Sequence, residues 1–432
     1  MVCSSPSFSA GAERGGGLVN DSTVVRLPQL AWYGDTTLEI DLPAAWSVTV
    51  CRSQGADAPG LDDEGFRKAF AQPIGTRTVR ELARGRKRVA ILFDDACRPT
   101  PVATILPYIL EELSRAGIAD SDIRFVAALG AHGAMDGVSL RKKLGDDVMG
   151  RFLVYNHNPY ELCTPLGTTI RGTPVAINTE VMRCDLKIGI GSIMPHLITG
   201  FSGGPKIILP GVASIETIGV NHNKYGGPGR TDIGRYEGNV VKADMDEAAR
   251  MAGLDVKIDA LLNLKREVTS LFVGDVVEEH LQGVAAARKH YATEYVGDCD
   301  IVIANCYFKA NGIPPAPRVA GPLLKSAGGD MVLIVVTPEG QWPHYVSRSW
   351  GENLGGRTWA PKAALPRNTS RLTILAPYPD RTGMDYIAPY DRVNWARDWS
   401  EVRAMLERTY GRSARVAVIP DATCQYFPGE PA

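Results

Sequence analysis

The feature of this chain that most constrains its fold is a recurring order of short apolar strands and amphipathic helices. Residues 89–95 (VAILFDD) form an apolar run that ends in two acids, which is typical of a strand buried on both faces of a sheet. Pro99 and Pro101 suit the start of a helix expected over 102–117, because a first helical turn needs no proline N–H. A strand expected over 124–133 completes a β-α-β unit, and such units build parallel sheets with right-handed crossovers.

The same order continues along the chain. In its first part we expect a strand at 184–193 and hairpins at 27–42 and 256–275. We expect helices at 62–86, 139–152, 239–253 and 275–295. A second set begins after Gly297, with strands at 300–308, 331–338, 371–377 and 415–421 and helices at 317–329 and 399–411. The predicted fold is therefore α/β, with two doubly wound domains, mostly parallel sheets and an active site in the interdomain cleft.

The predicted parts of the chain are three. Residues 1–24 are expected to be a flexible leader, 25–296 the N-terminal domain and 297–432 the C-terminal α/β domain. The Gly- and Pro-rich segment 350–366 is expected to be a loop or a lid.

Composition excludes several classes of protein. The 432 residues include 47 basic and 48 acidic side chains, and 44% are hydrophobic, as in an ordinary globular protein. No apolar run reaches the ~18 residues that span a bilayer, and the near-zero net charge argues against nucleic acid as a partner. The eight cysteines form no C-x-x-C pair, and the N-terminus lacks the pattern of a secretory signal, so we expect a cytoplasmic protein with no membrane partner.

Polar residues gather where predicted strands end, which is the edge where doubly wound sheets bind ligands. Asp95 and Arg98 follow the first strand: Arg98 could bind a carboxylate or phosphate, or the pair could be a helix-capping aspartate and a surface arginine. His132 stands between glycines at the end of the next strand, where it could be catalytic or structural.

The third segment runs from His196 through Ser202, Gly203, Gly204 and Lys206 to His222. Its glycines expose backbone N–H groups that can cradle an anion, and a phosphate is the natural guest. The segment is no Walker A loop, because the lysine is followed by isoleucine. The lysine could contact a phosphate or act as a nucleophile that bonds to a cofactor.

Three of the seven histidines, at 132, 196 and 222, lie in these segments. They could together ligate a metal, as in a zinc-dependent hydrolase. They could instead divide the work, with one as a ligand and two as acid and base on opposite faces of a substrate carbon, as inversion of a stereocentre requires. A non-catalytic phosphate- or nucleotide-binding protein is a further alternative. The other histidines, at 157, 280, 290 and 344, are expected to be structural or on the surface.

The segments DDACRPTP, ALGAHGAM and IGSIMPHLITGFSGGPKIILPGVASIETIGVNH resemble the lactate racemase family, whose members use a nickel-pincer nucleotide. The resemblance covers most of the chain, including the spacing of His196, Lys206 and His222. It implies an isomerase: a racemase or epimerase of 2-hydroxy acids. It further implies transient hydride transfer to the cofactor through a 2-keto acid intermediate.

The resemblance also implies a cofactor and roles for single residues. The cofactor is pyridinium-3-thioamide-5-thiocarboxylic acid mononucleotide, linked covalently through Lys206, with nickel ligated by His222. Ser202, Gly203 and Gly204 would bind the nucleotide phosphate in the N-terminal domain. His132 and His196 would exchange the hydroxyl proton, while Asp95 would orient a histidine and Arg98 contact substrate or cofactor. Enzymes that build the cofactor would be partners, and the chain is compatible with a homo-oligomer.

Departures from the family fall on the substrate side. The family's glutamine and lysine of the second domain have no match, and Lys309 and Asn311 are candidates to replace them as substrate contacts. Cys97 and Gly133–Ala134 also differ from common family residues. We therefore expect a substrate other than lactate, such as a larger 2-hydroxy acid or a sugar acid.

Overall fold

The computed structural model describes residues 22–225, 232–346, 364–381 and 387–429. Most of the expected leader and most of the expected lid at 350–366 therefore lie outside the described residues. Residues 22–24, which we assigned to the leader, already belong to strand β1 (Ser22–Gln29). No helix in the described ranges is long and apolar enough to cross a membrane.

The first of two six-stranded sheets has the strand order β13-β12-β9-β4-β5-β6. Neighbouring strands are parallel, apart from the antiparallel pair β12 and β13. The bounds are β4 Val89–Asp94, β5 Ile123–Ala128, β6 Leu153–Asn156, β9 Leu186–Ser192, β12 Val256–Leu262 and β13 Val268–Gly274. The expected parallel sheet and the hairpin at 256–275 are confirmed.

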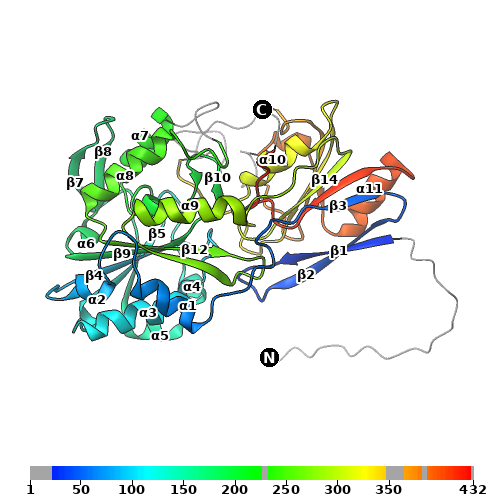
Figure 1. The fold of residues 1–432 in the computed structure, drawn as a ribbon. Helices are drawn as coiled ribbons and strands as arrows, with labels where there is room; N and C mark the ends of the chain where they lie inside the picture. Colours follow the sequence, from blue (N-terminus) through cyan, green and yellow to red (C-terminus); the bar gives the residue numbers. More distant parts are fainter. Residues whose placement is uncertain (1–21, 226–231, 347–363, 382–386, 430–432) are drawn as a thin grey trace, which may run out of the picture.

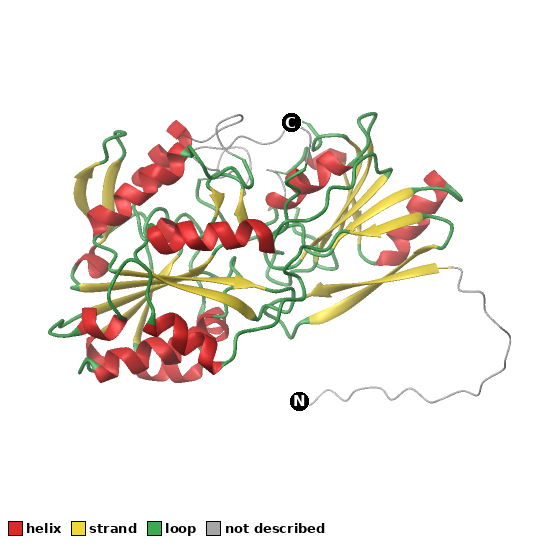
Figure 2. Ribbon diagram, viewed as in Figure 1, coloured by secondary structure: helices red, strands yellow, loops and turns green. Residues whose placement is uncertain are grey.

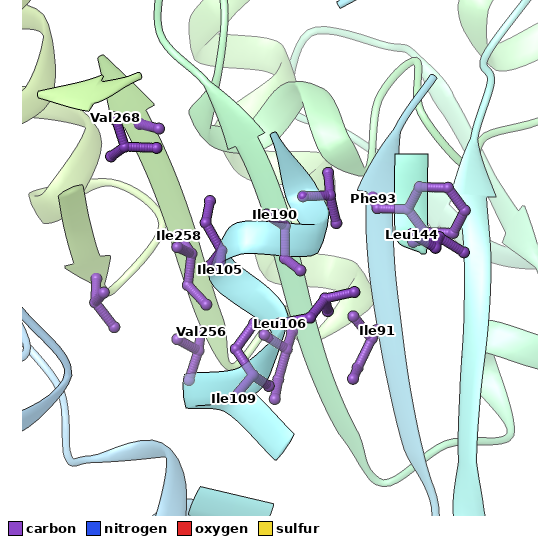
Figure 3. Packing of buried hydrophobic residues seen from close by; sticks show 14 of the residues in the cluster. Ile91, Phe93, Ile105, Leu106, Ile109, Leu144, Ile190, Val256, Ile258 and Val268 are labelled. Carbon is purple, nitrogen blue, oxygen red and sulfur yellow. The ribbon is translucent and has the colours of Figure 1, made fainter. Parts of the chain in front are cut away.

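Helices cover both faces of this sheet (Figure 1). Successive side chains of a strand point to opposite faces, so Ile91 and Phe93 pack with Ile105 and Ile109 of α3 (Figure 3), whereas Leu92 packs on the other face. The helices of this half are α1 Asp63–Ala71, α2 Val79–Ala83, α3 Val102–Arg115, α4 Gly137–Leu144, α5 Asp146–Arg151, α6 Thr179–Met182, α7 Ile215–Tyr225, α8 Val240–Ala252 and α9 Glu278–His290. A small hairpin of β7 Cys163–Thr168 and β8 Pro174–Asn178 adjoins them.

Removing a side chain from this core should be costly. Ile91 has no exposed surface in the middle of β4, so we expect Ile91→Ala to lower the free energy of unfolding by about 2–5 kcal/mol through lost burial and a new cavity. Val138→Ala is the control: Val138 is 60% exposed, and the change should stay within about 0.5 kcal/mol. Urea denaturation followed by circular dichroism measures both, and equal effects would contradict this view of the core.

The second sheet has the order β17-β16-β15-β14-β18-β3, with all neighbours parallel (Figure 2). Its bounds are β3 Ser47–Val50, β14 Ile301–Cys306, β15 Gly329–Val335, β16 Thr369–Leu375, β17 Val393–Ala396 and β18 Arg415–Ile419. One face packs on α11 (Trp399–Tyr410) and the hairpin of β1 and β2 (Thr36–Pro43), and the other on α10 (Pro315–Ala320) and η3 (Gly321–Leu323).

Residues 25–50, which we predicted to belong to the N-terminal domain, thus contribute strand β3 to the second sheet and most of a hairpin that packs against it. The reason is apolar burial: Ile40 and Leu42 of the hairpin have no exposed surface and pack among residues of β14, β15 and β18. The division into 25–296 and 297–432 remains a proposal about chain organisation, and these residues are its exception.

Two local expectations were wrong in extent, and several elements were not expected. The helix expected over 139–152 is two helices, because Gly145 adopts φ +84 between them. The helix expected over 317–329 ends early, and η3 contains Pro322, which cannot donate a backbone hydrogen bond. Strands β3, β6, β7, β8 and β17 and helix α7 were not anticipated.

The strand order of each sheet reverses at a point that faces the cleft. In the first sheet the chain turns in opposite directions from β4, to β5 on one side and β9 on the other. In the second sheet β14 lies between β15 and β18 in the same way. Ligands bind at such reversal points, beyond the carboxyl ends of the strands, so the fold directs both domains toward one site.

Candidate active site

One pocket contains nearly all the residues singled out from the sequence. It lies at the ends of β4, β5 and β9 and is closed on one side by segments that follow β14 and β15 of the second sheet. Of the predicted site residues, the pocket is lined by Asp95, Arg98, His132, His196, Ser202, Gly203, Lys206, His222, Lys309 and Asn311. The exception is Gly204, which is not among the residues that line the pocket.

His132 and Asp95 form a hydrogen-bonded pair. The Nδ1 atom of His132 lies 2.6 Å from a carboxylate oxygen of Asp95. Burial by itself raises the pKa of Asp95, but the His132 ring and the Arg98 charge outweigh it and hold that pKa well below its usual range. An ionised carboxylate can only accept, so Nδ1 of His132 carries the proton of this hydrogen bond.

His196 has the opposite arrangement of ring nitrogens. It lies on the short strand β10 (Pro195–His196), which pairs with β11 (Gly200–Phe201). Its Nδ1 accepts backbone N–H groups of Ile198 at 3.1 Å and Thr199 at 3.3 Å. Burial, followed by the charges of Lys206 and Lys309, lowers the pKa of His196 well below its usual range. The neutral ring therefore has its proton on Nε2.

Four cationic side chains line the same pocket: Lys257 is ion-paired with Asp259, and in the described parts of the chain no ion pair to a carboxylate involves the other three. These three are Arg98, Lys206 and Lys309. Burial, followed by the charges of Arg98 and Lys309, lowers the pKa of Lys206 to about 7. Burial and Arg98 likewise lower the pKa of Lys309 to about 7. The pocket therefore favours an anionic ligand and holds Lys206 close to its nucleophilic, uncharged state.

The lowered pKa of Lys206 predicts its reactivity in the cofactor-free protein. Acetylation by acetic anhydride, followed at the Lys206 peptide by mass spectrometry, should titrate with a midpoint near pH 7, whereas a solvated lysine titrates near ~10.4. Arg98→Gln removes a neighbouring positive charge, which makes protonation easier, so the midpoint should rise. Lys325, in a partly exposed ion pair with Asp300, is the internal control. A Lys206 midpoint equal to that of Lys325 would contradict the assignment.

His222 lies on α7 and lines the pocket. Burial and the Lys206 charge lower the pKa of His222 to about 3, so its ring is neutral, the form that binds metals. Its Nδ1 is buried without a hydrogen-bond partner. A neutral imidazole with an unsatisfied buried nitrogen fits the role of a metal ligand.

The three predicted histidines do not form a joint metal site. Within the described ranges, the set of side chains close enough to share an ion is Asp95, Cys97 and His132, and it includes neither His196 nor His222. His132 is hydrogen-bonded to Asp95, whereas His196 lies on β10 and His222 on α7. The zinc-hydrolase alternative therefore lacks its proposed ligand set.

In the glycine loop, the backbone N–H of Gly204, which we expected to bind a phosphate, is already hydrogen-bonded within the protein. The N–H of Gly204 donates to a carboxylate oxygen of Asp259 at 2.5 Å. A carboxylate of the protein thus takes the place that we assigned to a phosphate. Ser202 is also engaged, because its Oγ donates to the carbonyl of Ser192 at 2.9 Å and accepts the N–H of Met194.

His344 is a pocket residue that sequence reasoning missed. Its ring lies edge-on to that of His132, with centroids 5.0 Å apart. The segment around it forms a β-bridge with the first domain, in which Gly133 donates to the carbonyl of Pro343 and Tyr345 to that of Ala131. Nothing in the local pattern QWPHY marks it, because the contact depends on how the two sheets pack.

Asn311 connects the two halves of the site. Its Nδ2 donates to Glu339 at 3.1 Å and to the carbonyl of Ala96 at 3.4 Å. Lys309 lines the same pocket, and within the described ranges no side-chain hydrogen bond engages its ammonium group.

Comparison with known proteins shows a family resemblance in the first part of the chain. Residues 33–231 match the family described as the lactate racemase N-terminal domain. The resemblance first seen in three sequence segments is thereby confirmed over this range.

Two relatives are named lactate racemase. One, from Thermoanaerobacterium thermosaccharolyticum, is 31% identical over 283 residues, which are 63% of this chain and 65% of the relative. The other, from Lactiplantibacillus plantarum, is 29% identical over 291 residues, 65% of this chain and 67% of the relative. The matched region thus spans slightly less than two thirds of the Thermoanaerobacterium relative.

Solved structures share the fold over a longer range. The lactate racemase apoprotein of T. thermosaccharolyticum superimposes with a TM-score of 0.71 at 22% identity, covering 94% of this chain and all of that one. A structural-genomics protein from Thermotoga maritima has a TM-score of 0.61 at 15% identity, covering 81% and 97%. The α/β fold of this chain is therefore shared with the lactate racemase apoprotein over nearly its whole length.

Proposed function

We propose that this protein is a nickel-pincer-nucleotide-dependent racemase or epimerase of a 2-hydroxy acid other than lactate. The observation that carries the proposal is the meeting of His132, His196, Lys206 and His222 in one pocket. Two of these histidines have opposite proton arrangements, the lysine lies close to its uncharged state, and the third histidine has an unsatisfied nitrogen.

The residues present fit the proposed cofactor at two points. Lys206 would hold it covalently through its amine, and His222 would ligate nickel. When bound, the cofactor would supply an electron-poor ring that accepts and returns the C2 hydride, because the C2–H of a hydroxy acid is too weakly acidic for a histidine base alone. For the phosphate, Gly203 and neighbouring residues are the candidates, since the Gly204 N–H is already bound.

The two remaining histidines would handle the hydroxyl proton. His132 would accept it at Nε2, with Asp95 stabilising the resulting imidazolium. After the planar 2-keto acid has turned, His196 would deliver a proton from its Nε2. Its ring would first take up a second proton from water, so that delivery leaves the neutral imidazole. In the reverse direction His196 would accept the hydroxyl proton and His132 would deliver one. These two arrangements let one pocket act on both enantiomers.

Arg98 and Lys309 are the proposed contacts of the substrate carboxylate. A guanidinium binds a carboxylate through two hydrogen bonds, and Lys309 adds a charge from the second domain. The residues around this end, including Cys97, His344 and Trp342, are polar or bulky side chains. They support a substrate with a polar substituent beyond C2, such as a sugar acid. The cytoplasm as location, cofactor-building enzymes as partners and a homo-oligomeric state also belong to this proposal.

The deciding experiment uses C2-deuterated 2-hydroxy acids. Protein co-expressed with cofactor-building enzymes and loaded with nickel is incubated with a panel of hydroxy monoacids, diacids and sugar acids. We expect one class to change configuration at C2 while keeping its deuterium, because a hydride that moves to a ring and back does not mix with water. Deuterium loss to solvent would contradict hydride transfer, and no reaction with any acid would contradict the function.

A further inference from the structure

A buried ion pair that the proposed chemistry does not use lies beneath the Lys206 loop. Lys257 and Asp259 are both on β12, and their side chains are 1% and 0% exposed. Nζ of Lys257 lies 2.6 Å from Oδ1 of Asp259 and also donates to the carbonyl of Ile258 at 2.8 Å. Burying two charged groups is costly. The contact made by the second carboxylate oxygen of Asp259 therefore indicates what the pair holds in place.

That second oxygen, Oδ2, accepts the N–H of Gly204 at 2.5 Å. The approach is possible only with glycines in the loop: Gly203 has φ +83, and a Cβ there would lie 2.7 Å from the same oxygen. The loop continues directly into η2 (Gly204–Ile207), which contains Lys206. Asp259 is therefore hydrogen-bonded directly to the turn that leads into Lys206, a residue that lines the pocket.

His280 anchors the other side of the loop. Burial lowers the pKa of His280 to about 4, so the ring is neutral. Its Nε2 lies 2.9 Å from the carbonyl of Ser202, and its Nδ1 lies 3.3 Å from the hydroxyl of Tyr236. The backbone of Ser202 to Gly204 is thus held from two elements, β12 and α9.

Glu279 completes the surroundings of Asp259. Burial, followed by the charge of Asp259, raises the pKa of Glu279 well above its usual range, so Glu279 is neutral. Of these two acids, Asp259 is the one in contact with Lys257. A carboxylate accepts from both Lys257 and Gly204 at once, whereas an amide could accept from only one of them.

We propose that Asp259 is a positioning residue that holds the Gly203–Gly204 turn, so that Lys206 is presented for covalent attachment of the cofactor. The attachment rests on the proposed function, but the holding of the turn does not. Lys257 orients the carboxylate through its 2.6 Å contact. Because Asp259 does not itself line the pocket, it acts through the loop and touches neither substrate nor cofactor.

The test compares Asp259→Ala, Asp259→Asn and the double variant Lys257→Gln/Asp259→Asn. In the double variant the asparagine oxygen can accept the Gly204 N–H while its amide donates to the glutamine oxygen, which restores the turn without charge. Asp330→Asn is the matched control, because it breaks the ion pair of Asp330 with Arg371 in the second sheet. Thermal unfolding confirms that each variant is folded.

Two measurements read the result. Deuterium uptake of the peptide covering 202–208 in the cofactor-free protein should rise in both single variants and return to the wild-type level in the double variant. After co-expression with cofactor-building enzymes, the fraction of protein with an adduct on Lys206 should fall at least several-fold in the single variants and recover in the double variant.

Unchanged uptake and adduct in Asp259→Ala and Asp259→Asn would overturn the proposal, as would a double variant as impaired as Asp259→Asn. If the wild-type protein acquires no adduct, the proposed function fails, and the uptake measurement still decides whether Asp259 holds the turn. The two failures are therefore distinguishable.

Discussion

Lys206→Arg is expected to leave the protein folded but without any covalent adduct after co-expression with cofactor-building enzymes. Arginine keeps a positive charge at the position, yet its guanidinium stays protonated and is no nucleophile. Lys206, in contrast, has a pKa of about 7 in the cleft and is uncharged in a large fraction of molecules at neutral pH. Intact-mass spectrometry should show the adduct only with lysine present, and epimerisation should drop to background.

Lys325→Arg is the matched control for that experiment. Lys325 pairs with Asp300 in the second domain, outside the pocket, so its replacement should change neither adduct nor rate. An adduct that persists in Lys206→Arg, located by peptide mapping on another residue, would contradict the assignment of Lys206.

Replacing either proton-transfer histidine is the second change with a large expected effect. His196→Asn and His132→Asn should each lower kcat by about 10²–10⁴-fold, the usual contribution of a positioned acid or base. Both directions of the reaction should suffer, because each histidine would accept the proton in one direction and deliver it in the other. Rates from both pure enantiomers, followed by polarimetry or chiral chromatography, measure the effect.

Two further observations make this prediction specific. The Lys206 adduct should be retained in both variants, since neither histidine holds the cofactor in the proposal. His157→Asn is the control, because His157 is a buried neutral histidine outside the pocket, hydrogen-bonded to the carbonyl of Ala213. A loss of activity confined to one enantiomer as substrate, or a rate within ten-fold of wild type, would contradict the two-histidine scheme.

Much of the fold could be predicted from the sequence because the strands of a parallel sheet are apolar on both faces. The run at 89–95 and the runs at 184–193 and 300–308 carry that signal in a few residues, and each is a central strand. Strand β3 and the hairpin at 163–178 escaped, because they are short or half-exposed and have no such run.

The pocket was predictable to the extent that its residues follow strand ends. Asp95, His132 and Lys309 come shortly after β4, β5 and β14, and the carboxyl ends of parallel strands meet at one edge. His344 and Asp259 were not predictable in the same way. His344 reaches the pocket through a bridge between domains, and Asp259 lies within a strand whose pattern indicates only burial.

The sequence by itself determined the class of fold, a family resemblance and the candidate site residues, since local apolar patterns and motif spacing are properties of the chain alone. The tertiary structure decided which of those side chains meet and in which protonation state. In the folded chain Nδ1 of His132 is hydrogen-bonded to Asp95, and Nδ1 of His196 accepts a backbone N–H. The Gly204 N–H donates to a carboxylate of the protein, where we had expected a phosphate. Such contacts depend on distances of a few ångströms between elements far apart in the chain.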